Sequence, residues 1–324
     1  MTSTPVRKGS KRGRRKYDGP TAEEKLVQTL IELMESGTNP WRKEWTTGTN
    51  CGQHRNLVTG KPYRGANPLL LEMYQNAKGH PLSLWAGRSQ AKEKGWFPVK
   101  GCTCAYILRP QQNRRTEEVE VPGKKEKETV TRSWVSYKTA AVFNVADLKG
   151  GDEASQAELD SLILKASNIP QTPEPERLAR AEDVLSHWPV ETNWRGEQAF
   201  YQPGSDQITM PLRQLFHSSQ ALYATWAHET VHSTGHESRL KRSMAHKFGS
   251  RGYAREELVA ELGAFLICNR LEISSASENH AAYLEHWIEV LKEGPSVLFK
   301  VLSDATKASN LILGPEVTEE ETEK

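Results

Sequence analysis

The stretch Ala227 to Gly235, AHETVHSTG, constrains this chain more than any other, because two histidines stand four positions apart and a glutamate follows the first. On an α-helix, residues four apart lie on one face, about 6 Å from each other. His228 and His232 can then bind one metal ion, and Glu229 can reach a water molecule at the open coordination position. The motif therefore predicts a helix here and the chemistry of a zinc peptidase.

A pattern with three fixed positions also arises by chance, so the flanking residues matter. Ser218 and Ser219 are good N-cap residues, Leu222 and Trp226 give the next segment an apolar stripe, and Gly235 follows the second histidine. This context favours a real helix over a chance match.

A catalytic zinc site needs a third protein ligand. The metzincin spacing would place that ligand at Ser238, which is unsuitable, and His236 lies beyond the glycine break. In REELVAELGAFLICN, Glu257 and Glu261 share a helix face, as in gluzincins, and we expect Glu257 on the metal and Glu261 hydrogen-bonded to a ligand histidine. Two solvated helix carboxylates are the alternative, and another divalent transition metal is the alternative to zinc.

Upstream of the motif, Gln198 to Pro211, QAFYQPGSDQITMP, predicts two short strands around a Gly-Ser-Asp turn. A strand beside the metal-binding helix is where a peptide substrate can bind by adding to the sheet edge.

The net charge of +2 conceals a division between the two halves of the chain. Residues 1–150 hold 27 Lys and Arg against 14 Asp and Glu, a net charge of +13, which leaves −11 for residues 151–324. The basic half is the one expected to meet a polyanion. No apolar stretch has transmembrane length and no secretory signal is recognisable, so we expect a cytoplasmic protein without membrane contacts.

The basic half begins with an arm, residues 1–18, that has seven Lys and Arg between Arg7 and Lys16 and few apolar residues. Beyond a helix predicted near residues 23–36, aromatic and cationic residues alternate, as in proteins that bind single-stranded DNA. Because Trp is often a core residue, packing is the alternative for these rings. The expected DNA-binding residues are Trp41, Arg42, Lys43, Trp45, Arg55, Lys61, Tyr63, Arg64, Trp85 and Lys92.

The predicted fold is α+β in two domains. Residues 19–150 are expected to form an α+β domain that binds single-stranded DNA, and residues 110–131 a loop or long hairpin between two strands. Residues 151–314 are expected to form a mostly helical, gluzincin-like domain with a small antiparallel sheet, followed by an acidic tail, residues 315–324. Helices are predicted near residues 176–188, 280–292 and 297–312.

Two sets of motifs resemble known families. The runs NPWRKEW, RNLVTGKPYRGAN and AVFNVADLKG resemble the N-terminal single-stranded-DNA-binding domain of ArdC-type antirestriction proteins and of conjugative plasmid primases. The runs AFYQPGSDQITMP, HETVHSTGHESRLKR and YAREELVAELGAFL resemble the zincin-like metallopeptidase domain that follows it in the ArdC family. The resemblance spans roughly Thr21 to Leu313 in the family's domain order.

The resemblance implies a protein of a plasmid or mobile element that protects incoming DNA from restriction, with a host restriction component as a conceivable peptide substrate. It supports His228 and His232 as ligands and adds Asn56 and Asn67 to the expected DNA-binding residues. Two alternatives stay open: a DNA-coating protein with a structural or vestigial metal site, and an accessory protein of conjugative DNA processing.

Overall fold

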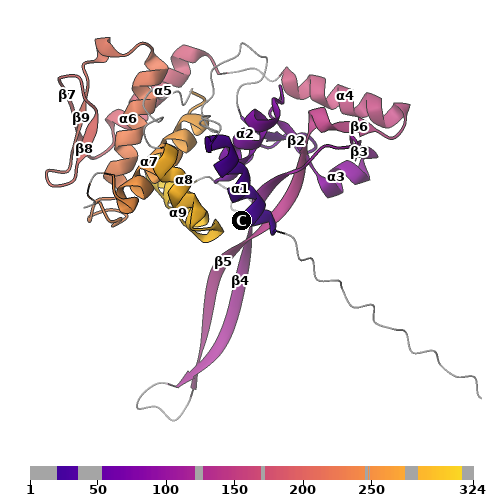
Figure 1. The fold of residues 1–324 in the computed structure, drawn as a ribbon, viewed down its shortest axis with the longest axis horizontal. Helices are drawn as coiled ribbons and strands as arrows, with labels where there is room; N and C mark the ends of the chain where they lie inside the picture. Colours follow the sequence, from indigo (N-terminus) through magenta and orange to yellow (C-terminus); the bar gives the residue numbers. More distant parts are fainter. Residues whose placement is uncertain are drawn as a thin grey trace, which may run out of the picture.

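The computed structural model describes residues 20–35, 53–120, 127–168, 172–244, 247, 249–273 and 284–315 (Figure 1). Trp41, Arg42, Lys43, Trp45, the basic arm and the acidic tail beyond residue 315 lie outside these ranges. Within them, no helix is long and apolar enough to cross a membrane.

The N-terminal part combines helices with two small sheets. One sheet has the strand order β1-β2-β5-β4, with β1 parallel to β2 and the other pairs antiparallel, and β3 pairs with β6. Its elements are α1 (Ala22–Glu35), β1 (Arg55–Asn56), α2 (Asn67–Lys78), β2 (Leu84–Gly87), α3 (Arg88–Glu93), β3 (Trp96–Pro98), β4 (Ala105–Glu120), β5 (Lys127–Asn144), β6 (Leu148–Gly150) and α4 (Glu153–Ser167).

Strands β4 and β5 form a long two-stranded ribbon that leaves the body of the molecule (Figure 1). Their register runs without a break from Ala105 opposite Val142 to Glu120 opposite Lys127. Only the root of the ribbon is part of a wider sheet, because β2 pairs with β5 at residues 142–144. The predicted long hairpin is confirmed, and its strands are longer than expected.

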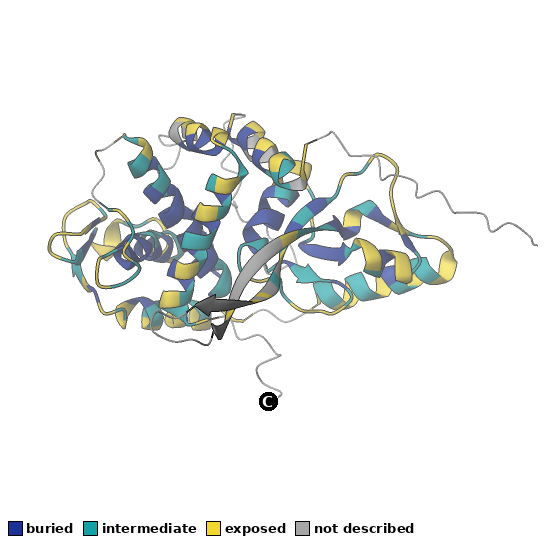
Figure 2. Ribbon diagram, turned by 90° about the horizontal axis from the view of Figure 1, so that it is seen from below, coloured by how far each residue is buried: buried dark blue, intermediate teal, exposed yellow. Residues whose placement is uncertain are grey.

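The C-terminal part is mostly helical. Its sheet has the order β7-β9-β8, in which β8 and β9 are antiparallel, as predicted, while β7 is parallel to β9 and was not predicted. Figure 2 shows the buried positions of the chain in dark blue, and in this part they include residues of α6, α7 and α9. The elements are α5 (Glu174–Ser186), β7 (Glu191–Trp194), β8 (Phe200–Gln202), β9 (Gln207–Met210), α6 (Ser219–Thr234), α7 (Arg251–Arg270), α8 (Leu284–Lys292) and α9 (Pro295–Leu313).

Two helices pack across the boundary predicted at residue 150. Helix α1 buries Val27, Ile31 and Met34 in the hydrophobic cluster of α6 to α9, and Lys292 on α8 forms an ion pair with Glu35 at 3.1 Å. Helix α4 follows residue 150 but buries Leu159 in the cluster that contains the N-terminal strands β3 and β6. The division between the hydrophobic clusters therefore does not follow the predicted boundary.

Candidate metal centre

Helix α6 carries the two histidines and begins as the sequence predicts. The Ser218 side chain accepts a hydrogen bond from the Ala221 backbone N–H at 3.1 Å, which caps the helix. Gly235 ends it with φ −75°, so no left-handed conformation requires a glycine there. A Cβ at Gly235 would instead collide with Met244 and lie 3.1 Å from Arg242 Nη2, so this glycine makes room for the segment after the helix.

Helix α7 crosses α6 at very close range, and Gly263 allows the approach. A Cβ at Gly263 would lie 2.8 Å from Val231 Cγ1 and 2.9 Å from its Cγ2, closer than real carbon atoms pack. Val231 precedes His232 on α6, and Gly263 lies two residues after Glu261 on α7. The tight crossing therefore holds the histidines of one helix against the carboxylates of the other.

The side chains of His228, His232 and Glu257 converge at this crossing, and one donor atom from each lies within 4.8 Å of the others. The two Nε2 atoms are 3.1 Å apart, and the Glu257 carboxylate oxygens lie 3.7 Å from His228 Nε2 and 3.5 Å from His232 Nε2. Donors around a tetrahedral zinc ion, at about 2.0–2.1 Å from it, are about 3.3 Å apart. The three side chains thus fit one divalent ion, and two histidines with one glutamate are a donor set of catalytic zinc sites.

Two further glutamates lie beside the outer nitrogens of the histidine rings. Glu261 Oε2 lies 3.5 Å from His228 Nδ1, and its predicted hydrogen bond to a ligand histidine stays a prediction. Glu256 Oε1 lies 3.4 Å from His232 Nδ1, and Arg242 contacts this carboxylate with Nη2 at 2.7 Å and Nε at 3.0 Å. Carboxylates in such positions fix the ring orientation and raise the basicity of the ligand nitrogen.

Glu256 and Arg242 were not predicted from the sequence. Glu256 could have been found, because it directly precedes Glu257 and because a second ligand histidine needs a partner of its own. Nothing in the local sequence points to Arg242, which reaches the site through a loop and also donates to Thr234 Oγ1 at 2.7 Å and to the Val231 carbonyl at 2.9 Å.

The site carries excess negative charge in a nearly enclosed place. Burial raises the pKa of Glu257, but the hydrogen bond with His228 and the charges of both imidazoles outweigh it and lower this pKa to about 2. Burial lowers the pKa of His228, but hydrogen bonds to Glu257 and Glu261 and the charge of Glu229 raise it well above the ordinary value. The surrounding carboxylates therefore favour a positive charge at this site.

Glu229 lies next to His228 on α6 and is 7% exposed. Its charge contributes to the raised pKa of His228. A buried carboxylate beside the ligands is where a general base for a water molecule belongs. His236, in contrast, lies beside Asp206 at 3.9 Å and Ser238 at 2.8 Å, apart from this group.

The DNA-binding residues predicted in the N-terminal part divide into three sets. Trp85 is completely buried and donates from Nε1 to His54 Nδ1 at 3.0 Å, so the prediction that it stacks on bases is wrong. Asn56 and Asn67 use their amides within the fold: Asn56 accepts from the Thr59 N–H at 3.0 Å, and Asn67 exchanges hydrogen bonds with the Leu108 backbone at 2.8 and 3.0 Å. Lys61, Arg64 and Lys92 are exposed, whereas Arg55 and Tyr63 are half-buried.

The helix pair, the small sheet and the convergent histidines and glutamate define a zincin-like metallopeptidase domain, and the family model described as "Zincin-like metallopeptidase" matches residues 179–304. Residues 20–143 match the model "N-terminal domain of anti-restriction factor ArdC". The chain belongs to the ArdC family of antirestriction proteins.

Solved structures support this assignment. The metal-free antirestriction ArdC protein from plasmid R388 is 30% identical, with a TM-score of 0.61 over 90% of this chain and 96% of that one. The Mn(II)-bound structure of the same protein is 28% identical, with the same TM-score and coverage. That protein therefore binds a divalent metal.

Among curated relatives, a DNA primase TraC of Escherichia coli is 34% identical over 300 residues, which are 90% of this chain and 20% of the primase. A second TraC primase from the same organism is 33% identical over 301 residues, 90% of this chain and 27% of that protein. The uncharacterized protein y4eC of Sinorhizobium fredii is 27% identical over 289 residues, 89% of this chain and 90% of y4eC. The chain thus spans only 20% and 27% of the two primases it matches.

Proposed function

We propose that this chain is a plasmid-borne or mobile-element-borne antirestriction protein that binds single-stranded DNA and carries a zinc-dependent peptidase site. The observation that carries the peptidase part is the meeting of His228, His232 and Glu257 at separations of 3.1 to 3.7 Å. Zinc is the proposed metal, because the donors are two imidazoles and one carboxylate at near-tetrahedral separations. The protein acts in the cytoplasm of the cell that receives the DNA.

A zinc ion at this site would act as a Lewis acid toward a peptide carbonyl and lower the pKa of water. The protein's own residues do the rest. Glu229 accepts the proton of the attacking water on its carboxylate and passes it to the nitrogen of the leaving amine. Glu261 and Glu256 hold the outer nitrogens of His228 and His232, so that both Nε2 atoms stay aimed at the same point.

The peptide substrate is proposed to bind along β8. This strand is an edge of the three-stranded sheet and packs beside α6, so its outward hydrogen-bonding groups lie near the helix with the histidines. Phe200 on β8 is 40% exposed and offers an apolar contact for a substrate side chain. Edge addition uses main-chain hydrogen bonds, which suit a peptide of varied sequence.

The DNA-binding part of the proposal depends on charge and on family. Residues 1–150 carry a net charge of +13, and the structure exposes Lys61, Arg64 and Lys92 on that half. The relatives are named antirestriction proteins and DNA primases, both of which deal with DNA. Single-stranded DNA is the proposed form, because the sequence interleaves cations with aromatic rings on which unpaired bases can stack.

Glu229→Ala separates peptide hydrolysis from DNA coating. The variant should bind zinc and single-stranded DNA as the wild type does, and it should not cleave a peptide library or a host restriction component. Metal content is measured by mass spectrometry of the dialysed protein, and antirestriction by plasmid transfer into a restricting recipient. Full protection by Glu229→Ala would assign antirestriction to DNA binding alone, and cleavage by Glu229→Ala equal to wild type would refute the peptidase assignment.

A further inference from the structure

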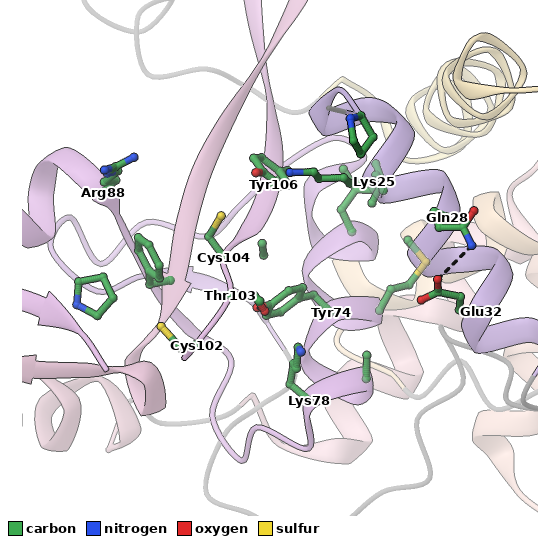
Figure 3. Close-up of a pocket in the computed structure, with 18 of the residues that line it drawn as sticks. Lys25, Gln28, Glu32, Tyr74, Lys78, Arg88, Cys102, Thr103, Cys104 and Tyr106 are labelled. Atoms are coloured by element: carbon green, nitrogen blue, oxygen red, sulfur yellow. Dashed lines mark hydrogen bonds between the residues drawn. The ribbon is translucent and has the colours of Figure 1, made fainter. Parts of the chain in front are cut away.

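A groove of about 1130 Å³ lies in the N-terminal part between α1, α2 and the segment that leads into β4 (Figure 3). It is separate from the metal centre and contains none of the DNA-binding residues predicted from the sequence. Tyrosine, lysine, arginine and apolar side chains line it. Among them are Pro20, Lys25, Tyr74, Lys78, Arg88 and Tyr106.

The Tyr74 ring is held in place by contacts within the fold. Tyr74 shares a hydrogen bond with Thr103 Oγ1 at 2.5 Å, and its ring meets the edge of the buried Trp85 ring at a centroid distance of 6.0 Å. In Figure 3 the Tyr74 ring lies inside the groove and Tyr106 lies beside Lys25. A fixed ring that stays half-exposed loses little conformational entropy when a base stacks on it.

The charges in the groove favour an anion. Lys78 and Arg88 are exposed and Lys25 is half-buried, and Lys78 Nζ lies 6.0 Å from the centre of the Tyr74 ring. The acidic residues of the lining belong to α1: Glu24 accepts from the Thr21 N–H at 2.7 Å, and Glu32 accepts from Gln28 Nε2 at 3.0 Å. Three cations against two carboxylates give the lining a net positive charge, which favours an anionic ligand.

The chain before the groove points to a polyanion. Pro20, the first described residue, lines the groove, and the seven Lys and Arg between Arg7 and Lys16 precede it directly. The basic segment is a poor occupant of a groove lined by cations, because like charges repel. A polyanion such as a strand of nucleic acid suits both the cations of the groove and the basic composition of the preceding sequence.

We infer that this groove is the binding site for single-stranded DNA, with bases stacked on Tyr74 and Tyr106 and phosphates contacted by Lys78 and Arg88. The inference rests on the proposed single-strand binding and specifies where it occurs. Rings and cations side by side are the combination that single-strand binders use, because any base can stack and every nucleotide carries a phosphate. A duplex cannot offer its bases to the rings.

The test uses the full-length protein and a fluorescent oligo-dT of about 16 nucleotides, near the upper site size of single-strand binding domains. Tyr106→Ala should weaken binding at least about fivefold, the lower end of the effect of losing one stacked base. Tyr74→Ala should weaken binding as Tyr106→Ala does. Melting curves identify any variant that weakens binding only because it unfolds.

The cations are tested by the double variant Lys78→Gln, Arg88→Gln, which should also make the salt dependence shallower by about 1.4 in log–log slope. Lys165→Gln, on the exposed face of α4, is the control that removes a charge elsewhere. The groove would not be the binding site if the double variant and Tyr106→Ala bound DNA normally while the double variant Lys61→Gln, Arg64→Gln lost affinity. Single-strand binding itself would then still stand. A wild-type protein that does not bind oligo-dT would overturn the proposed DNA binding itself.

Discussion

Gly263→Ala should disturb the metal centre without touching a ligand. The new Cβ would lie 2.8 Å from Val231 Cγ1, whereas an ordinary carbon contact is about 3.5 Å or more. Helices α6 and α7 must therefore separate locally by roughly 0.7 Å, or the Val231 side chain must move. Metal sites tolerate about 0.2 Å in each ligand distance, so Glu257 would be carried out of reach of ideal coordination.

The expected effect is large on metal affinity and small on stability. Alanine is favoured over glycine inside a helix by about 1 kcal/mol, and overpacking costs about 1–3 kcal/mol, so the metal-free protein should lose at most about 2 kcal/mol. Zinc affinity should fall about 10- to 100-fold, as it does when a metal site loses the contacts that orient its ligands. Competition with a chromophoric chelator measures the affinity, and melting in EDTA measures the metal-free stability.

Two further variants make the test specific. Gly204→Ala is the matched control, because a Cβ there has no atom within 4 Å, and it should leave zinc affinity unchanged. Adding Val231→Ala to Gly263→Ala restores space at the crossing and should recover most of the affinity. If Gly263→Ala binds zinc like wild type, or if Val231→Ala fails to rescue a weakened variant, the close crossing does not set the ligand geometry.

Three other predictions follow from the packing around the site. Glu256→Gln should lower zinc affinity about 10- to 100-fold, because His232 loses its charged partner; unchanged affinity in the chelator assay would deny Glu256 that role. The hydrogen bond from Arg213 lowers the pKa of Glu182, so the ion pair stabilises the fold above pH 4.5 and this stabilisation is lost as the pH falls further. The difference in Tm between wild type and Glu182→Gln should therefore shrink on acidification. A Tm difference that stays constant with pH would contradict the role of this pair. A fragment that ends at residue 150 exposes the apolar face of α1 and loses α4. It should therefore bind hydrophobic dyes and melt without a cooperative transition. A sharp melting transition of this fragment would contradict the importance of these two helix contacts.

The metal centre could be predicted largely from sequence because its ligands lie on two helices with local signals. The cap at Ser218, the spacing of His228 and His232, and the EELVAE run are each readable within a few residues. The contact between the helices depends on Gly263, whose role appears only once Val231 lies opposite it. The structure agrees with the predicted geometry, and metal binding by these residues stays a prediction.

Two features of the N-terminal part were not predicted from the sequence: helix α2 and the burial of Trp85. Helix α2 was missed although Pro68 near its start and Gly79 after its end, with φ 66°, are ordinary helix boundary signals. The burial of Trp85 could not be read from its neighbours, because alternating rings and cations suit both a core strand and a binding surface. Periodicity gives a helix a face, but it does not say which distant element covers that face.

The packing of α1 against α8 has a consequence for biosynthesis. The residues between Glu35 and Leu284 must be translated before the apolar face of α1 can meet its partner. At about 5–20 residues per second this takes roughly 10 to 50 seconds, far longer than a helix needs to form. During that interval Val27, Ile31 and Met34 lack the cover of α8, and α1 can dock against α8 only after Leu284–Lys292 has been synthesised.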